Sequence, residues 1–259
     1  MINITGKKRK MRIAIENNRL MMSFERAFAN DLSKIIDMQY ESAAKRLDDF
    51  NLRFESAIES YNPELKTIYR NNLKRIMSHF GYRALAAIGY KEHKSPMSDF
   101  LVYMDNYIAQ YVALKVVAVS KTTINVINHI IRIGNDAGWT NAEMAKKIRD
   151  VKEISKITRA RTIARTETHS AAMNAFQGSM EISGMIREKE WISVNDSRTR
   201  TSPFNHAAAD GERVGINDMF FRTGQALRYP GDMQNGSAAN VINCRCNQLF
   251  FTDRTINAA

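Results

Sequence analysis

The chain has 259 residues, of which 44% are hydrophobic, so it can form one large domain or two smaller ones. Its 38 Lys and Arg outnumber its 27 Asp and Glu, and the net charge of +11 favours a polyanionic partner such as DNA or RNA. With only two cysteines, a disulfide framework is excluded and a reducing compartment is favoured. The sequence has no secretory signal and no apolar run of about 18 residues, which predicts a soluble, intracellularly made protein without a membrane partner.

The first half of the chain is predicted to be helical. Residues 17–60 contain neither Gly nor Pro, and apolar residues recur there at alternating spacings of four and three. This stripe comprises Ile36, Tyr40, Ala43, Leu47, Phe50, Phe54 and Ala57. The spacing is close to a heptad and predicts one long amphipathic helix, broken at most once. The stripe needs a partner surface, either on another helix of this chain or on another protein.

Further helices are expected at about 62–80, 95–114, 122–133, 142–149 and 155–180. Asn62 and Pro63 form a helix start, and Thr140 with Glu143 forms a capping box. After Gly184 the pattern changes, because residues 190–194 alternate like a strand, 248–251 form a second candidate strand, and turn-forming residues fill the interval. The predicted fold is α+β: a mainly helical N-terminal docking domain, 1–135, and a loop-rich C-terminal domain with a small sheet, 136–259.

Basic residues gather at two places. The stretch 146–165 carries eight Lys and Arg against two acidic residues, and the tip 7–12 is a candidate flexible arm. Such side chains can neutralise phosphates without reading base sequence, or they can simply form a solvated surface. The candidate DNA-binding residues are Lys7, Lys8, Arg9, Lys10, Lys146, Lys147, Arg149, Lys156 and Arg159.

Cys244 and Cys246 are candidate metal ligands together with His206. In an extended segment, alternate side chains point to the same side, so both thiolates could meet one imidazole. Asp196 or Asp210 could complete a tetrahedral zinc site that stabilises a loop-rich region. The alternative is that the cysteines are small buried apolar residues. We therefore treat Cys244, Cys246, His206 and Asp196 as a candidate structural zinc site, with no other cofactor expected.

An enzyme is the competing class of protein. Asp196, His206 and Asp210 could support acid–base chemistry, and Glu167 could act as a general base. An active site requires these residues to converge in one pocket. The sequence contains no nucleophile elbow, no glycine-rich phosphate loop and no His-Glu-x-x-His motif. We predict that the protein is not an enzyme and that these side chains have structural roles.

A series of short motifs in the second half carries a family resemblance. In chain order they are Ala164-Arg165-Thr166-Glu167, Trp191, Asp196-Ser197-Arg198-Thr199, His206, Asp210-Gly211, Leu227–Asp232 and Asn243-Cys244-Arg245-Cys246. Taken in this order, residues 136–251 resemble the phage Mu F-like minor head protein family. The motif residues Arg165, Glu167, Trp191, Arg198, Asp210 and Gly211 are expected to hold the helix and the turn-rich segment together.

The resemblance implies a low-copy minor head protein of a tailed bacteriophage. Its expected partners are the phage portal protein, the major capsid or scaffolding protein, and packaged double-stranded DNA. Its expected place is the capsid interior near the portal vertex, after synthesis in the host bacterial cytoplasm, with a role in head assembly and DNA packaging or ejection. The alternatives are a nucleic-acid-binding module without assembly function and a DNA-acting or host-targeting enzyme, such as a nuclease or transferase, delivered with phage DNA.

Two departures from the family pattern bear on the metal. Many members carry Cys-x-x-Cys where this chain has residues 200–203, Arg-Thr-Ser-Pro, and many have His-Pro where this chain has Val241 and Ile242. Both changes remove candidate ligands. The resemblance therefore implies either that a metal has been lost here or that His206 and Asp196 replace the missing ligands.

Overall fold

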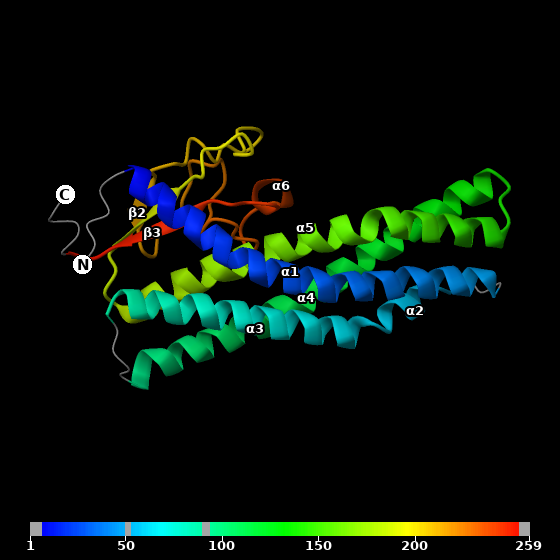
Figure 1. Cartoon of the computed structure of the whole chain (residues 1–259), viewed down its shortest axis with the longest axis horizontal. Helices are drawn as coiled ribbons and strands as arrows, with labels where there is room; N and C mark the ends of the chain where they lie inside the picture. Colours follow the sequence, from blue (N-terminus) through cyan, green and yellow to red (C-terminus); the bar gives the residue numbers. More distant parts are fainter. Residues whose placement is uncertain (1–6, 50–52, 90–93, 254–259) are drawn as a thin grey trace. The chain divides into compact units, whose positions relative to one another are not determined.

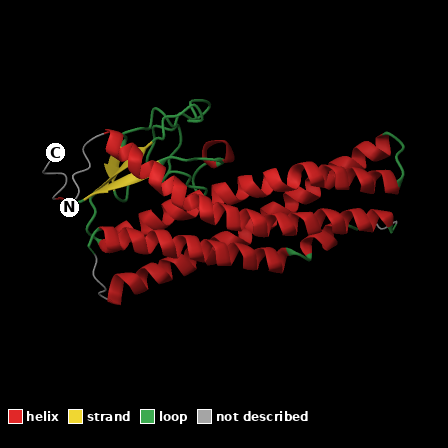
Figure 2. Ribbon diagram, in the orientation of Figure 1, coloured by secondary structure: helices red, strands yellow, loops and turns green. Residues whose placement is uncertain are grey.

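The computed structural model describes residues 7–49, 53–89 and 94–253 (Figure 1). Its elements are α1 (Lys7–Asp48), α2 (Glu55–Glu59), α3 (Asn62–Ala87), α4 (Lys94–Asp136), α5 (Asn141–Ser183), β1 (Glu188–Ile192), β2 (Arg213–Gly215), α6 (Ala238–Val241) and β3 (Asn247–Phe251). Helices make up 68% of the structure, and a small antiparallel sheet lies in the C-terminal part (Figure 2), which confirms the predicted α+β class. None of the helices in the described ranges combines the length and hydropathy that a membrane span requires.

The long N-terminal helix breaks once, as predicted, between Asp48 and Glu55. Two other predicted boundaries are wrong, because 95–114 and 122–133 belong to one helix, α4, and 142–149 and 155–180 belong to another, α5. Residues 115–121 and 150–154 contain neither Gly nor Pro, so nothing stops helix propagation there. Lys152, in the second of these stretches, is buried. Packing therefore stabilises α5 here, although the apolar periodicity of the segment is weak.

The chain divides into two compact units, each drawing on separate stretches of sequence. The helical unit comprises Glu25–Asn72 and Asn106–Ala164, and the loop-bearing unit comprises Met1–Phe24, Leu73–Asp105 and Arg165–Ala259, within the described residues. Both therefore combine N-terminal and C-terminal parts of the chain. The predicted division into a helical docking domain, 1–135, and a loop-rich C-terminal domain, 136–259, stays a prediction.

The apolar stripe of α1 is buried within the helical unit. Ile36, Ala43 and Leu47 have no exposed surface, and Phe54 and Ala57 after the break are also buried. Phe50 lies outside the described residues. Phe28 of α1 meets Tyr69 of α3 edge to face at 5.1 Å between ring centroids. Other helices of this chain thus supply a partner surface for the stripe.

The sheet of the loop-bearing unit has the strand order β2-β1-β3, with both pairs antiparallel. Glu188 lies opposite Gly215 in β2 and Phe251 in β3, so β1 is the central strand. Strands were predicted close to β1 and β3, whereas β2 and α6 were not anticipated. A core cluster comprises Trp191, Ala209, Phe220, Leu227, Val241, Cys244 and Cys246, so the cysteines lie in the apolar centre of this unit.

Candidate functional site

The structure brings together three of the predicted metal ligands. His206 lies in the long loop between β1 and β2, whereas Cys244 and Cys246 precede β3. The Nδ1 atom of His206 lies 3.4 Å from Sγ of Cys246 and 3.7 Å from Sγ of Cys244. All three potential ligand atoms lie within 4.8 Å of one another, and all three residues are buried. The structure thus places these three residues together, and metal binding by them stays a prediction.

The local backbone turns sharply just before the cysteines. Asn243 adopts a positive φ of 58°, and its N–H donates to Thr166 Oγ1 on α5 at 3.2 Å. Asn is among the few side-chain-bearing residues that adopt this left-handed conformation readily. Residues 244–246 then run towards β3, so that Cys244 and Cys246 both reach the same histidine.

The imidazole of His206 is oriented by Asn240. Its Nε2 lies 2.7 Å from Oδ1 of Asn240. The amide of Asn240 cannot rotate freely, because its Nδ2 donates to Gln225 Oε1 at 3.1 Å and Thr223 Oγ1 at 3.3 Å. The carbonyl oxygen of Asn240 therefore faces His206, and this contact, shorter than the 3.4 Å between Arg200 Nη1 and the same Nε2, favours the imidazole proton on Nε2 and the Nδ1 lone pair towards the sulfurs.

The two thiols have different electrostatic properties. Burial works to raise the pKa of Cys244, but the hydrogen bond with Cys246 and the cations of Arg200 and Arg245 hold that pKa below its ordinary value. Interaction with Cys244, together with burial, raises the pKa of Cys246 well above its ordinary value. The pair thus favours negative charge on Cys244 in a buried setting.

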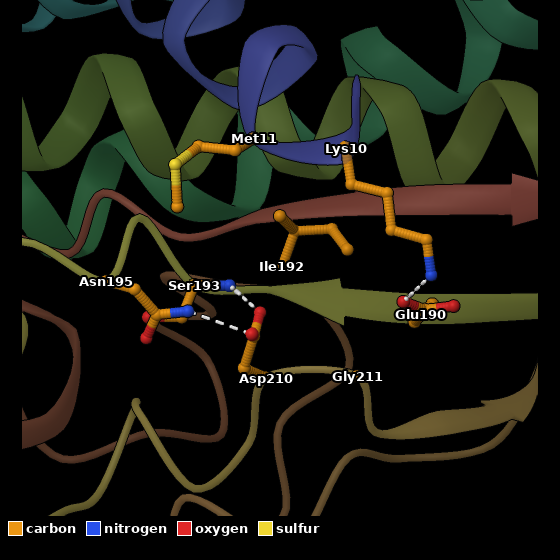
Figure 3. Close-up of a pocket in the computed structure, with 8 residues that line it drawn as sticks. All are labelled: Lys10, Met11, Glu190, Ile192, Ser193, Asn195, Asp210 and Gly211. Carbon is orange, nitrogen blue, oxygen red and sulfur yellow. Dashed lines mark hydrogen bonds and ion pairs between the residues drawn. The ribbon is translucent and has the colours of Figure 1, made fainter. Parts of the chain in front are cut away.

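Asp196 and Asp210, the two predicted candidates for a fourth ligand, have other partners. Both carboxylate oxygens of Asp196 accept hydrogen bonds from Arg245, at 2.6 and 2.8 Å, and this contact holds the pKa of Asp196 well below its usual range. Asp210 accepts hydrogen bonds from the Ser193 N–H at 2.9 Å and from Asn195 Nδ2 at 2.8 Å (Figure 3). Each carboxylate therefore holds a turn, and neither belongs to the His–Cys–Cys group.

A pocket of about 260 Å³ lies beside this turn-rich segment (Figure 3). It is lined by Lys10, Met11, Glu190, Ile192, Ser193, Asn195, Asp210 and Gly211. Its charged groups already have partners, because Lys10 Nζ lies 2.5 Å from Glu190 Oε1 and Asp210 binds Ser193 and Asn195. Asp196 and His206, the other candidate acid–base residues of this segment, do not line the pocket. The expectation that the protein is not an enzyme stays a prediction.

The remaining motif residues lie where the loops meet α5 and the sheet. Arg165 of α5 contacts Asn243 Oδ1 at 3.5 Å, and Glu167 is buried on the same helix. Trp191 is fully buried and packs edge to face on His206 and Phe220. Gly211 has φ +80° and donates its N–H to the Trp191 carbonyl, whereas Arg198 is exposed and donates its N–H to Asp196.

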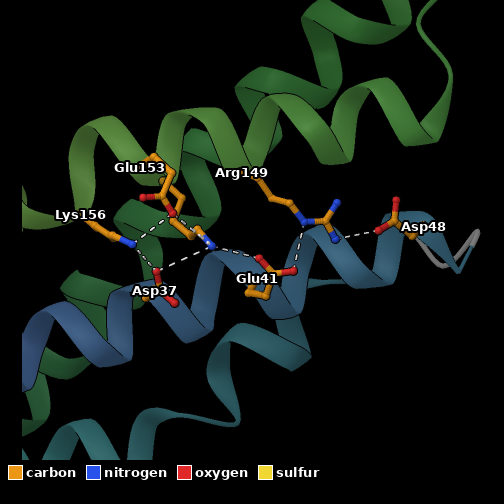
Figure 4. Close-up of polar contacts among 7 residues, drawn as sticks. Asp37, Glu41, Asp48, Arg149, Glu153 and Lys156 are labelled. Atoms are coloured by element: carbon orange, nitrogen blue, oxygen red, sulfur yellow. Dashed lines mark hydrogen bonds and ion pairs between the residues drawn. The ribbon is translucent and has the colours of Figure 1, made fainter.

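The basic stretch of α5 faces acidic residues of α1 (Figure 4). Arg149 forms ion pairs with Glu41 at 3.0 Å and with Asp48 at 2.7 Å, and Lys156 forms one with Asp37 at 2.8 Å. Lys152 forms an ion pair with Glu41 at 3.0 Å. We call this set, Asp37, Glu41, Asp48, Arg149, Lys152 and Lys156, the α1–α5 ion-pair seam. The sequence pattern that indicates this seam is its spacing. The three acidic residues are four and seven positions apart and the three basic residues three and four positions apart, which places each set on one helix face.

The other predicted DNA-binding residues are in different environments. Arg159 donates to Thr123 Oγ1 and the Val119 carbonyl, and burial lowers its pKa. Lys146 pairs with Asp150 at 3.1 Å, and Lys10 pairs with Glu190. Lys147 is exposed and forms no ion pair within the described part of the chain. The side chains of Lys7, Lys8 and Arg9 lie outside the described residues. DNA binding by this set stays a prediction.

Several buried polar residues of this unit were not predicted as site residues from the sequence. His169 of α5 is buried, its Nε2 lies 2.7 Å from the Cys246 carbonyl, and burial lowers its pKa to about 4. Asn240 and Lys189 are buried completely. Amides and lysines are common in any sequence, and the partners lie tens of residues away, so no local pattern distinguishes these residues.

The fold and site define an α+β protein whose loop-rich C-terminal part is organised around a buried His–Cys–Cys group. The family model described as phage Mu protein F like protein matches residues 125–249, which confirms the predicted resemblance. The match begins within α4 and includes α5, β1, β2 and every residue of the group. The matched family is one of phage head-morphogenesis proteins, and the match covers 125 of the 259 residues. A search of curated proteins and a search of solved structures found no match.

Proposed function

We propose that this chain is a minor head protein that binds the portal of a tailed phage and acts in head assembly and in DNA packaging or ejection. The observation that carries the proposal is the family match over residues 125–249, which includes the whole His–Cys–Cys group. The portal is the first expected partner, and the major capsid or scaffolding protein and packaged DNA are the others. The proposed location is the capsid interior near the portal vertex.

Exposed apolar side chains of the helical unit support a protein partner. Leu114 and Val117 on α4 are 71% and 60% exposed, and Ile154 on α5 is 80% exposed. Exposed aliphatic side chains gain free energy when a partner removes them from water, about 25 cal/mol for each Å² of apolar surface. Residues 114 and 117 are three apart, so they share one face of α4.

The α1–α5 ion-pair seam limits the support for DNA as the principal partner. Arg149, Lys152 and Lys156 already contact carboxylates, so a phosphate would have to compete with Glu41 or Asp37 for them. Lys147 is exposed and is a simpler candidate for phosphate contact. DNA contact in the virion would then accompany protein docking.

Quantitative mass spectrometry of purified heads tests this function. We expect the wild-type chain at a few copies per portal in heads that contain DNA and in empty heads. We expect the double substitution Leu114→Ser and Val117→Ser to leave a folded protein that is depleted from heads, because both residues are exposed. Met185→Ser, at a 44% exposed position of the loop-bearing unit, is the matched control and should be incorporated normally.

The outcomes separate the parts of the proposal. Absence of the wild-type chain from heads would refute the virion role. Normal incorporation of the double variant would remove α4 as the docking surface. Recovery from DNA-filled heads alone would make DNA, rather than the portal, the principal partner.

A further inference from the structure

We infer that His206, Cys244 and Cys246 bind a zinc ion, which joins the loop between β1 and β2 to the segment that leads into β3. The ion would connect two segments about 40 residues apart in sequence, in a unit whose long loops contain little regular structure. This inference does not rest on the proposed head function, because it concerns the isolated chain.

The distances between the candidate ligand atoms fit one tetrahedral ion. Zinc lies about 2.3 Å from a thiolate sulfur and about 2.0–2.1 Å from an imidazole nitrogen, so adjacent ligand atoms of a tetrahedron are about 3.6 Å apart. The observed separations from His206 Nδ1 are 3.4 Å to Cys246 Sγ and 3.7 Å to Cys244 Sγ. Small side-chain adjustments would bring all three atoms to bonding distance.

The histidine is already oriented as a ligand. Metal-binding histidines commonly donate their second ring N–H to an oxygen acceptor, which fixes the ring orientation and the tautomer. Asn240 Oδ1 is that acceptor here, at 2.7 Å from Nε2, and Asn240 is fixed in turn by Gln225 and Thr223. An apolar pair of cysteines would need no such support from a fully buried amide.

Charge balance also favours a divalent ion. When zinc binds, both thiols lose their protons, and the resulting charge of −2 would be costly away from water without the ion. One Zn²⁺ neutralises this charge, so the loaded site has no net charge and can remain buried. Arg200 donates to the carbonyls of Asn240 and Ile242 and lies 3.4 Å from His206 Nε2, and Arg245 binds Asp196, so both arginines have partners other than the sulfurs.

The ligand set differs from the one that the sequence suggests. Asp196 is engaged by Arg245, and Asp210 holds the turn at Ser193, so the chain supplies two sulfurs and one nitrogen. A water molecule would then be the fourth ligand, as in zinc sites with three protein ligands. Asn240 lies outside this ligand set and acts through His206 as a positioning residue.

A thiol nucleophile is the alternative use of the same residues. Cys246 contacts one ring nitrogen of His206 and Asn240 contacts the other, which is the arrangement of contacts in a Cys-His-Asn triad. However, Cys246 is only 4% exposed, and a second sulfur lies at comparable distance from the same Nδ1 atom. A nucleophile needs access to its substrate, whereas a structural ion needs enclosure and a second sulfur.

Metal analysis of the purified full-length chain tests the inference. We expect about one zinc per chain, and after exchange with Co²⁺ we expect the visible absorption of a tetrahedral site with thiolate ligands. Cys246→Ser should lose zinc. Asn240→Ala should retain the three ligands but bind zinc about 10–100-fold more weakly. Asp196→Asn is the matched control and should keep full zinc content.

Three results would overturn the inference. The first is a folded wild-type chain that takes up neither zinc nor cobalt. The second is equal zinc content in the wild type and in Cys246→Ser. The third is rapid alkylation of Cys246 by iodoacetamide in the folded wild-type protein after incubation with zinc, which would identify an accessible nucleophile instead of a bound ligand. The cobalt spectrum is recorded on the wild type, so the test holds even where a variant fails to fold.

Discussion

The two units of this chain satisfy their polar groups in different ways. In the helical unit, helices satisfy the backbone, apolar side chains fill the interior, and the charged side chains of the α1–α5 ion-pair seam, apart from buried Lys152, are partly exposed. In the loop-bearing unit, buried polar side chains satisfy the backbone of the long loops. Glu212 accepts the N–H groups of Phe221 and Arg222 at 2.7 and 3.0 Å. Where regular structure ends, individual side chains take over its hydrogen bonds.

Substitution of Asp232 tests this comparison with the largest expected effect. Asp232 is fully buried and accepts the N–H groups of Arg228, Gln234 and Asn235. Asp232→Ala leaves these donors without an acceptor, and we expect it to lower the free energy of unfolding by about 4 kcal/mol. Urea denaturation followed by tryptophan fluorescence measures the change, because Trp191 lies in the same unit.

Asp232→Asn is the control, because its amide oxygen can still accept some of these hydrogen bonds and the loss should be smaller. A loss below about 1 kcal/mol in Asp232→Ala would mean that water replaces the carboxylate and that side chains do not determine this loop.

The buried amine of Lys189 makes the stability of this unit depend on pH. Burial lowers the pKa of Lys189 to about 8, although Glu181, Asp218 and Asp232 act to raise it and Arg228 acts to lower it further. The unfolded state therefore binds more protons between pH 8 and about 10.4, and stability contributed at this site rises with pH across that window. The full rise is about 3 kcal/mol.

Lys189→Met should abolish that rise. The unfolding free energies of the wild type and of Lys189→Met are measured at pH 7 and at pH 10. The difference between the two proteins is compared at the two pH values, so that the contributions of other titrating groups largely cancel. Lys189 donates to the Arg228 carbonyl at 2.7 Å, so the variant loses a hydrogen bond at every pH. Equal pH dependence in the two proteins would show that the amine is protonated and hydrated in the folded state.

The helical unit contains a buried polar contact of the kind that dominates the other unit. Gln39 of α1 is fully buried, donates to Ser120 Oγ at 3.0 Å and accepts from Thr123 Oγ1 at 3.0 Å, both on α4. Gln39→Ala leaves the Thr123 hydroxyl without this acceptor and opens a small cavity, and we expect a loss of about 2 kcal/mol in thermal or urea unfolding. Gln39→Glu, which keeps the shape but adds a buried charge, should cost more; a neutral result for both would mean that water enters here.

The same contrast explains how much the sequence predicts. The stripe on α1 and the strands near residues 190 and 248 follow from periodicity, because each element repeats its burial along its own length. The His–Cys–Cys group follows from residue types with few other uses. The sequence does not predict the roles of Asn240, Asp232 and Lys189. An isolated polar residue shows no pattern in the sequence, and its role is set only when the fold brings distant partners to it.

The ion-pair seam was missed for another reason. The spacing of Asp37, Glu41 and Asp48 puts three acids on one face of α1, but spacing alone cannot identify the helix that this face meets. The basic residues of α5 therefore looked available for DNA. Pairing between helices is a property of the fold, whereas charge density is visible in the sequence.

The seam also yields the smallest expected change in stability and the sharpest test of DNA binding. Glu41 is 46% exposed, so its contacts with Arg149 and Lys152 are screened, and Glu41→Gln should cost about 0.5 kcal/mol at low salt and less at high salt. The pKa of Glu41 is lowered, chiefly by its hydrogen bond with Lys152 against the effect of burial, so this contribution to stability is present at neutral pH and is lost as pH falls through the folded-state pKa.

Removing the acids of the seam leaves the cations of α5 without their carboxylate partners. The triple substitution Asp37→Asn, Glu41→Gln and Asp48→Asn should therefore steepen the salt dependence of DNA binding if α5 contacts phosphates. We expect this steepening in fluorescence-anisotropy titrations with duplex DNA, and an unchanged slope would place DNA contact away from Arg149, Lys152 and Lys156.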